Sequence, residues 1–253
     1  MTQLHDVVFV VYAEYSTIVR FNANTRQRLT DIDFSTSECP CDIAACEQTS
    51  HVYVADFMQQ CIWRVSADGA EIRRWLPKSP DDTFGPRTLS VTSTRLLVTS
   101  LYRKLMQFDA DGNELRRVHL PDYMMPHHAV ESPTGTFVVC QHNRQTENYQ
   151  INEVNAVGEV LRQFSISHLP SVELPGLTSP PHVAVDSRGN ILVEDDVNGL
   201  ILLLDAHLTL RRVIVDEHQL NYKRPWCLCY TEQSGQLLVG ISNRSVAVFD
   251  VLR

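Results

Sequence analysis

The stretch PHVAVDSRGNILVED, residues 181–195, decides the fold. A proline precedes a short apolar run, a polar segment follows with glycine at position 189, and a second apolar run ends at two carboxylates. Glycine accepts the positive φ that tight turns require, so the segment predicts two strands joined by a hairpin. Neither apolar run reaches the ten or so residues of a helix.

The same pattern recurs along the chain. The proline before a short strand appears five times, with steps of 46, 40, 55 and 44 residues, at Pro40, Pro86, Pro126, Pro181 and Pro225. A strand centred on valine appears six times, with steps of 44, 44, 41, 54 and 46 residues, at Val10, Val54, Val98, Val139, Val193 and Val239. Asp68-Gly69 and Asp111-Gly112 are hairpin turns, and each leads into a strand that ends in two arginines. A four-stranded unit of about 40–50 residues is typical of a propeller blade.

These repeats predict an all-β chain that folds as a six-bladed β-propeller. We expect one domain over residues 1–253, with blades at about 1–38, 39–80, 81–121, 122–170, 171–220 and 221–253. The first and last units each yield only three strands by this count. The ring therefore either closes with two three-stranded blades or stays partly open.

Two units carry a family resemblance. Residues 181–195 and the segment Tyr53-Val54-Ala55-Asp56 resemble the NHL repeat, in which a proline, an apolar triplet with Asp, a Gly-Asn turn and a Val-Ala-Asp strand end follow one another. The other units keep the spacing without the signature. The resemblance implies a propeller like those that end tripartite-motif ubiquitin ligases, bind RNA or form an amidating lyase. Because the chain has no RING or B-box spacing, we expect it to be at most the propeller part of such an architecture.

Composition narrows the class of protein. The chain has 253 residues, a net charge of −8 and seven cysteines. The acidic balance disfavours a general nucleic-acid binder, and we expect no DNA partner. No apolar run approaches the ~18 residues of a membrane span, so we expect no membrane partner. The first residues lack the basic region of a signal peptide, and an odd cysteine number suits reduced thiols, so we expect a cytoplasmic protein.

The resemblance places the mouth of the propeller channel at the starts of the innermost strands. Convergent polar and aromatic side chains around such an opening are typical of a ligand site. The candidate residues there are Asp42, Arg87, His127, His128, His182 and Trp226. The alternative is that they line a solvated funnel.

A zinc site at the mouth is a second interpretation. His127 and His182 could supply two ligands, and the third would have to be Cys41, Asp42 or His128. No continuous spacing motif supports this set. We therefore expect no metal, no cofactor and no catalytic residue, although a metal-dependent lyase or hydrolase at the mouth stays an alternative.

A second candidate surface lies on the loops of the same face. Its residues are an acidic run and a basic aromatic corner, namely Glu194, Asp195, Asp196, Tyr222, Lys223 and Arg224. The loops of this face carry more acidic than basic side chains, whereas most of the repeated arginines lie on the outermost strands. Phosphate contacts dominate nucleic-acid affinity, so RNA is the disfavoured alternative. The sequence predicts a non-catalytic scaffold that binds a protein or peptide, with a basic partner favoured.

Overall fold

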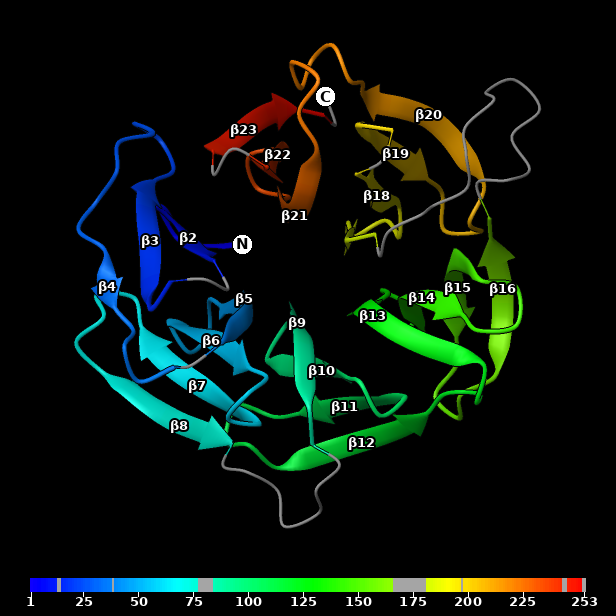
Figure 1. The fold of residues 1–253 in the computed structure, drawn as a ribbon, viewed down its shortest axis with the longest axis horizontal. Helices are drawn as coiled ribbons and strands as arrows, with labels where there is room; N and C mark the ends of the chain where they lie inside the picture. The colour runs from blue at the N-terminus through cyan, green and yellow to red at the C-terminus, as the bar shows by residue number, and fades with distance from the viewer. Residues whose placement is uncertain are drawn as a thin grey trace. The chain divides into compact units, whose positions relative to one another are not determined.

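The fold is described from a computed structural model, which describes residues 1–12, 15–37, 39–76, 84–165, 181–196, 198–242 and 245–251. Every regular element in these ranges is a β-strand, and the strands form six antiparallel sheets (Figure 1). Among these residues there is no helix with the length and apolarity of a membrane span. The predicted all-β fold of six sheets is confirmed.

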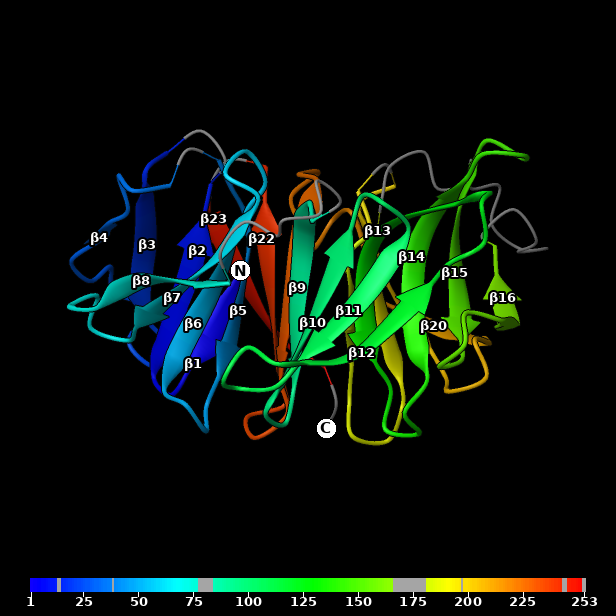
Figure 2. The same ribbon diagram turned by 90° about the horizontal axis from the view of Figure 1, so that it is seen from below.

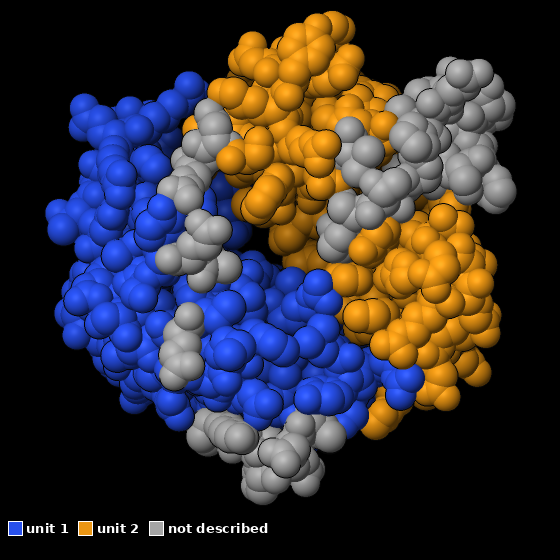
Figure 3. Space-filling model, in the orientation of Figure 1, with its two compact units in different colours: residues 1–118 blue, residues 119–253 orange. Residues whose placement is uncertain are grey.

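The first compact unit, residues 1–118, contains three four-stranded sheets (Figure 3, blue). Consecutive strands pair in chain order within each sheet. The strands are β1 (Thr2–Leu4), β2 (Val7–Val11), β3 (Thr17–Asn22) and β4 (Ile32–Asp33); β5 (Pro40–Cys46), β6 (His51–Asp56), β7 (Cys61–Ser66) and β8 (Ile72–Leu76); and β9 (Pro86–Thr92), β10 (Arg95–Ser100), β11 (Lys104–Phe108) and β12 (Glu114–His119).

The second compact unit, residues 119–253, contains two four-stranded sheets and a final sheet of three strands (Figure 3, orange). Its strands are β13 (Met124–Glu131), β14 (Phe137–Asn143), β15 (Asn148–Val154) and β16 (Val160–Phe164); β17 (Val183–Val185), β18 (Ile191–Asp195), β19 (Leu200–Leu204) and β20 (Leu210–Val215); and β21 (Pro225–Thr231), β22 (Gln236–Ile241) and β23 (Ser245–Asp250). Residues 166–180, which contain three prolines and a glycine between two repeats, lie outside the described residues.

The cores lie between consecutive sheets of a unit. Val54 and Val65 of the second sheet pack with Phe9 of the first sheet, and Val193 and Leu202 of the fifth sheet pack with Cys140 of the fourth. Because strand side chains alternate between faces, a sheet with neighbours on both sides must be apolar on both faces. This accounts for the nearly continuous apolar runs in the second strand of each sheet.

The first sheet has one strand more than predicted. Thr2–Leu4 pairs with Val7–Phe9 through a two-residue turn in which His5 has a φ of 50°. Without a proline before it, this strand has no signal in the sequence. The last sheet has three strands, as predicted.

We call the end at which the first strand of a sheet begins its proline end, after Pro40, Pro86, Pro126, Pro181 and Pro225. Antiparallel order brings the connection between the second and third strands to the same end, together with the connection that leads into the next sheet. Figure 2 shows the strands from the side, with connections at both of their ends.

Candidate functional site

The prolines that mark the first strands create bulges. The pairing register shifts between Pro40 and Asp42, between Pro86 and Thr88, between Pro126 and His128, and between Pro225 and Cys227. Proline cannot donate a ladder hydrogen bond, and a bulge re-aims the side chain that it leaves unpaired. The re-aimed residue directly follows each of these four prolines, and these residues are Cys41, Arg87, His127 and Trp226.

The next side chain along the chain links neighbouring sheets. The Leu89 N–H donates to Asp42 Oδ2 at 2.8 Å, and the Val183 N–H donates to His128 Nδ1 at 3.4 Å. The Leu228 N–H donates to His182 Nδ1, also at 3.4 Å. We call Asp42, His128 and His182 the inter-sheet acceptors, because each lies on or beside the first strand of one sheet and binds the first strand of the next.

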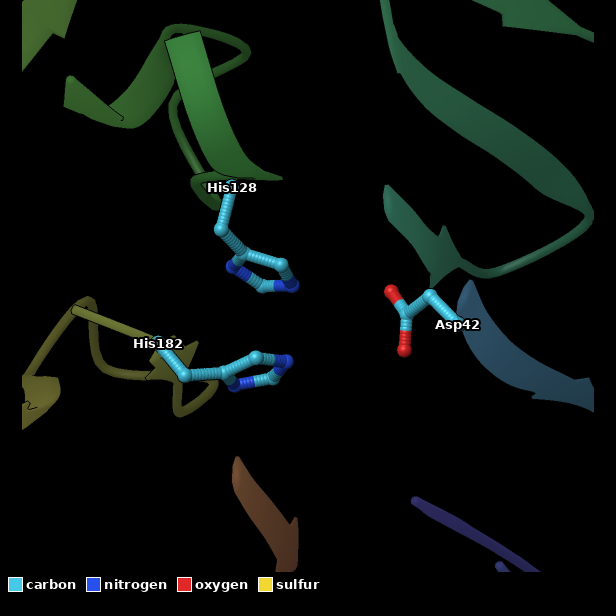
Figure 4. Close-up of side chains that lie close together, drawn as sticks. All are labelled: Asp42, His128 and His182. Atoms are coloured by element: carbon cyan, nitrogen blue, oxygen red, sulfur yellow. The ribbon is translucent and has the colours of Figure 1, made fainter. Parts of the chain in front are cut away.

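Two inter-sheet acceptors of the second unit lie face to face. The imidazole rings of His128 and His182 have their centroids 3.8 Å apart and are tilted by 31° (Figure 4). Burial lowers the pKa of His128 to about 3 and lowers the pKa of His182 well below its ordinary value. Both rings are therefore uncharged at neutral pH.

Asp42, also drawn in Figure 4, belongs to the first unit. Its carboxylate accepts the Ile43 N–H at 2.8 Å in addition to the Leu89 N–H. Burial raises the pKa of Asp42. Both backbone N–H groups that donate to this carboxylate belong to the first unit.

His127, by contrast, contacts an aromatic residue of its own sheet. Its ring lies 5.4 Å from that of Tyr149, edge to face, and the residue is buried in the fourth sheet. The zinc interpretation takes His127 and His182 as its first two ligands, whereas the structure brings His128, one of its alternative third ligands, against His182. Arg87 lies partly buried on β9 of the first unit.

The acidic run at the end of β18 is mostly enclosed. Glu194 and Asp195 are buried, and only Asp196 is partly exposed. The His182 N–H donates to Glu194 Oε2 at 3.0 Å, while Asp195 accepts hydrogen bonds from the backbone and side chain of Asn198. Burial raises the pKa of Glu194 well above its ordinary value. The structure thus brings Glu194 to His182, a link between two sites that the sequence treats separately.

The basic aromatic corner and the nearby mouth candidate Trp226 present their aromatic side chains to solvent. Tyr222 is 70% exposed and Trp226 is 68% exposed. The Tyr222 hydroxyl lies 2.6 Å from His218 Nδ1, and the two rings meet edge to face. Arg224 is exposed and Lys223 partly buried.

Further exposed aromatic residues escape sequence reasoning. Phe57 and Tyr102 flank Gly85, where a Cβ atom would lie 3.6 Å from the first ring and 3.2 Å from the second. Met58, beside Phe57, is 62% exposed, and Tyr15 is also exposed. Neighbouring Phe84 is buried, so an aromatic residue in a loop of the sequence does not by itself predict exposure.

The outer arginines lie as predicted on the fourth strands or beside them. Arg73 pairs with Glu71 at 3.0 Å, Arg117 with Glu114 at 2.6 Å and Arg211 with Asp205 at 2.6 Å. Arg162 pairs with Glu153. Each carboxylate belongs to the same sheet as its arginine or to a turn of that sheet.

Comparison with known proteins identifies the fold. No family model matches the sequence, and no curated protein matches it significantly. Among solved structures, Kuenenia stuttgartiensis hydrazine synthase is similar with a TM-score of 0.66 and 12% identity over 98% of this chain and 94% of that chain. A Bacteroides caccae protein of unknown function has a TM-score of 0.68 and 14% identity, over 92% and 82%.

Virginiamycin B lyase from Staphylococcus aureus is similar with a TM-score of 0.63 and 13% identity, over 99% of this chain and 83% of that chain. Identities this low carry the fold and not the activity. The repeats, the six sheets and these likenesses agree that the chain has the fold of a six-bladed β-propeller.

Proposed function

We propose that this propeller is a non-catalytic binding module that holds a protein or peptide segment against the proline ends of its sheets. One observation carries the proposal. Every exposed Phe, Tyr or Trp side chain in the described residues lies at the proline end of its sheet, and these are Tyr15, Phe57, Tyr102, Tyr222 and Trp226.

The exposed Leu and Val side chains have a different distribution. Leu115, Leu161 and Val213 lie on fourth strands, and Val157 lies in a turn at the opposite end of its sheet. Aromatic residues are enriched in protein interfaces and supply most of their strongest contacts. Each can bury about 150–250 Å². Their confinement to the proline ends therefore favours those ends of the sheets for binding.

The connection that carries Tyr222 is held in place before any partner arrives. Leu220 is buried, and the Tyr222 N–H donates to the Glu217 carbonyl at 2.7 Å. Asp216 and Gln219 exchange two hydrogen bonds across the same turn. A preformed loop loses little entropy on binding, so its exposed ring can contribute most of its contact energy.

The other interpretations have less support. RNA binding needs unpaired basic groups, whereas the fourth-strand arginines named above pair with carboxylates of their own sheets. The lyase likeness extends to the fold alone. The NHL-like pattern at residues 53–56 and 181–195 supports a binding role, because many propellers of that family are the interaction parts of larger proteins.

A peptide selection tests the proposal. The full chain is presented with a random peptide library, and recovered peptides are titrated against wild type and the variants Tyr102→Ala, Tyr222→Ala and Trp226→Ala. We expect at least one aromatic substitution to weaken binding by about tenfold or more, as expected for an interface anchor.

The matched controls are Leu161→Ala and Val213→Ala, which remove exposed apolar side chains from fourth strands. We expect their affinities to stay within about twofold of wild type. Failure to recover any peptide, or an equal loss in the controls, would contradict the proposal.

A further inference from the structure

The stacked imidazole rings of His128 and His182 form a pair of hydrogen-bonding groups in the second unit. Both residues belong to the second unit, where His128 lies on β13 and His182 directly precedes β17. Both are at the proline ends of their sheets. Because the ring centroids are 3.8 Å apart, a single ligand atom can contact both rings.

Their hydrogen bonds fix the position of the ring proton. His128 Nδ1 accepts the Val183 N–H, and His182 Nδ1 accepts the Leu228 N–H. A neutral imidazole has one protonated nitrogen, and the nitrogen that accepts a hydrogen bond cannot carry the proton. Both rings therefore hold their proton on Nε2, and each Nε2–H is a donor.

This tautomer is the wrong one for metal binding through the outer nitrogens. A histidine that ligates a metal usually donates its other N–H to an acceptor. Here the other nitrogen already accepts from a backbone N–H. Coordination through Nε2 would leave that backbone donor facing an N–H, or would require an imidazolate.

The two Nε2–H donors are available for a ligand. Figure 4 shows the outer nitrogens of the two rings on the same side of the pair. No other described residue accepts a hydrogen bond from either Nε2, and His182 is only partly buried. Two adjacent donors match the two lone pairs of one carbonyl oxygen.

The charge of the pair selects the class of acceptor. Both rings are neutral, so they offer no countercharge to a carboxylate that must give up its water. An uncharged amide carbonyl has a smaller desolvation cost. We propose that His128 and His182 together donate two hydrogen bonds to one carbonyl oxygen of an amide, such as a backbone carbonyl of a bound peptide. The peptide form of this inference rests on the proposed binding function.

Nuclear magnetic resonance of the full chain with ¹⁵N-labelled histidine tests the inference without any selected peptide. We expect both residues to show the Nε2–H tautomer. Titration with N-methylacetamide should shift both Nε2–H signals together, and acetate should shift them less. An Nδ1–H tautomer at either residue, a stronger response to acetate, coordination of added Zn²⁺ by the pair, or no response to the amide would overturn the inference.

Matched variants separate ligand binding by the Nε2–H donors from the structural role of the Nδ1 acceptors. In His128→Asn and His182→Asn, the side-chain oxygen can still accept the backbone N–H, whereas the outer donor is gone. We expect each variant to keep its melting temperature within a few degrees and to lose most of the amide response. His207→Asn, an exposed histidine of the same unit, is the control. If either variant unfolds, the wild-type tautomers and titrations still decide the inference.

Failure of this inference is distinguishable from failure of the proposed function. Selected peptides that need Tyr222 or Trp226 but bind both His→Asn variants at wild-type affinity would overturn the carbonyl assignment and leave the binding function standing. An intact amide response with no peptide binding would overturn the proposed function instead.

Discussion

Single side chains hold neighbouring sheets together at their proline ends. Asp42, His128 and His182 each accept a backbone N–H from the next sheet. Both His127 and His182 directly follow a proline, so spacing alone predicts them as counterparts. The bulge after Pro126 leaves His127 unpaired, and the next residue, His128, is the one that lies against His182. A bulge depends on local strand pairing. The sequence therefore indicates which histidines are near the proline ends, but not which two of them are in contact.

Replacement of Asp42 tests this role of the acceptors. Asp42→Ala leaves the Ile43 and Leu89 N–H groups without their acceptor, and each buried orphan donor costs about 1–3 kcal/mol. We expect the free energy of unfolding in urea to fall by about 2–4 kcal/mol, and by less in Asp42→Asn. Asp111→Ala, an exposed control, should stay within about 0.5 kcal/mol of wild type. An equal change in Asp42→Ala and Asp111→Ala would contradict the account.

Burial of Glu194 makes a pH-dependent contribution to stability. Its pKa in the folded protein is raised well above 4.5, so the folded state binds the proton more tightly than the unfolded chain. Stability is therefore lost as pH rises from the unfolded pKa to the folded pKa. Glu194→Gln keeps an oxygen for the His182 N–H and removes this titration.

We expect the unfolding free energy of Glu194→Gln, relative to wild type, to increase between about pH 5 and about pH 8. Urea unfolding of both proteins at the two pH values measures the difference, in which titrating groups not coupled to Glu194 cancel. A constant difference would show that Glu194 does not titrate with a raised pKa.

The hairpins between outer strands do more than reverse the chain. The Asp-Gly pairs in the sequence predict the turns, and Gly69 and Gly112 have φ values of 80° and 90°. What the sequence does not indicate is that Gly69 packs against the first sheet. A Cβ atom there would lie 2.7 Å from Ile32 Cγ1. Strand β1 was likewise unpredictable, because three residues without a flanking proline carry no periodic signal.

A pair of glycine substitutions separates turn strain from sheet packing. Gly69→Ala and Gly135→Ala both place alanine at a φ near 80°, but a Cβ at Gly135 would meet no described atom within 4 Å. The left-handed conformation costs about 1–2 kcal/mol in both variants. We expect Gly69→Ala to lose about 1 kcal/mol or more beyond Gly135→Ala in thermal or urea unfolding, because Ile32 must move. Equal losses would mean that the first and second sheets do not pack closely at this turn.

Across the whole molecule, the period of the sequence predicts the six sheets, whereas the placement of the aromatic residues emerges only from the structure. The repeated residues are those that form the strands and turns of each sheet. Exposure depends on packing, as the contrast between exposed Phe57 and buried Phe84 illustrates. The sequence also suggests solvent-facing carboxylates at the end of β18, but Glu194 and Asp195 are buried. The aromatic side chains, rather than this acidic run, therefore carry the proposed binding surface.

Hydrogen–deuterium exchange of the full chain, with and without a selected peptide, tests that surface most directly. The account predicts that bound peptide slows exchange in the connections at the proline ends, chiefly residues 56–60, 100–104 and 216–226. The turns at the opposite ends, such as residues 132–136, 155–159 and 205–209, should exchange at unchanged rates. Protection confined to those opposite turns or to the fourth strands would contradict the central claim.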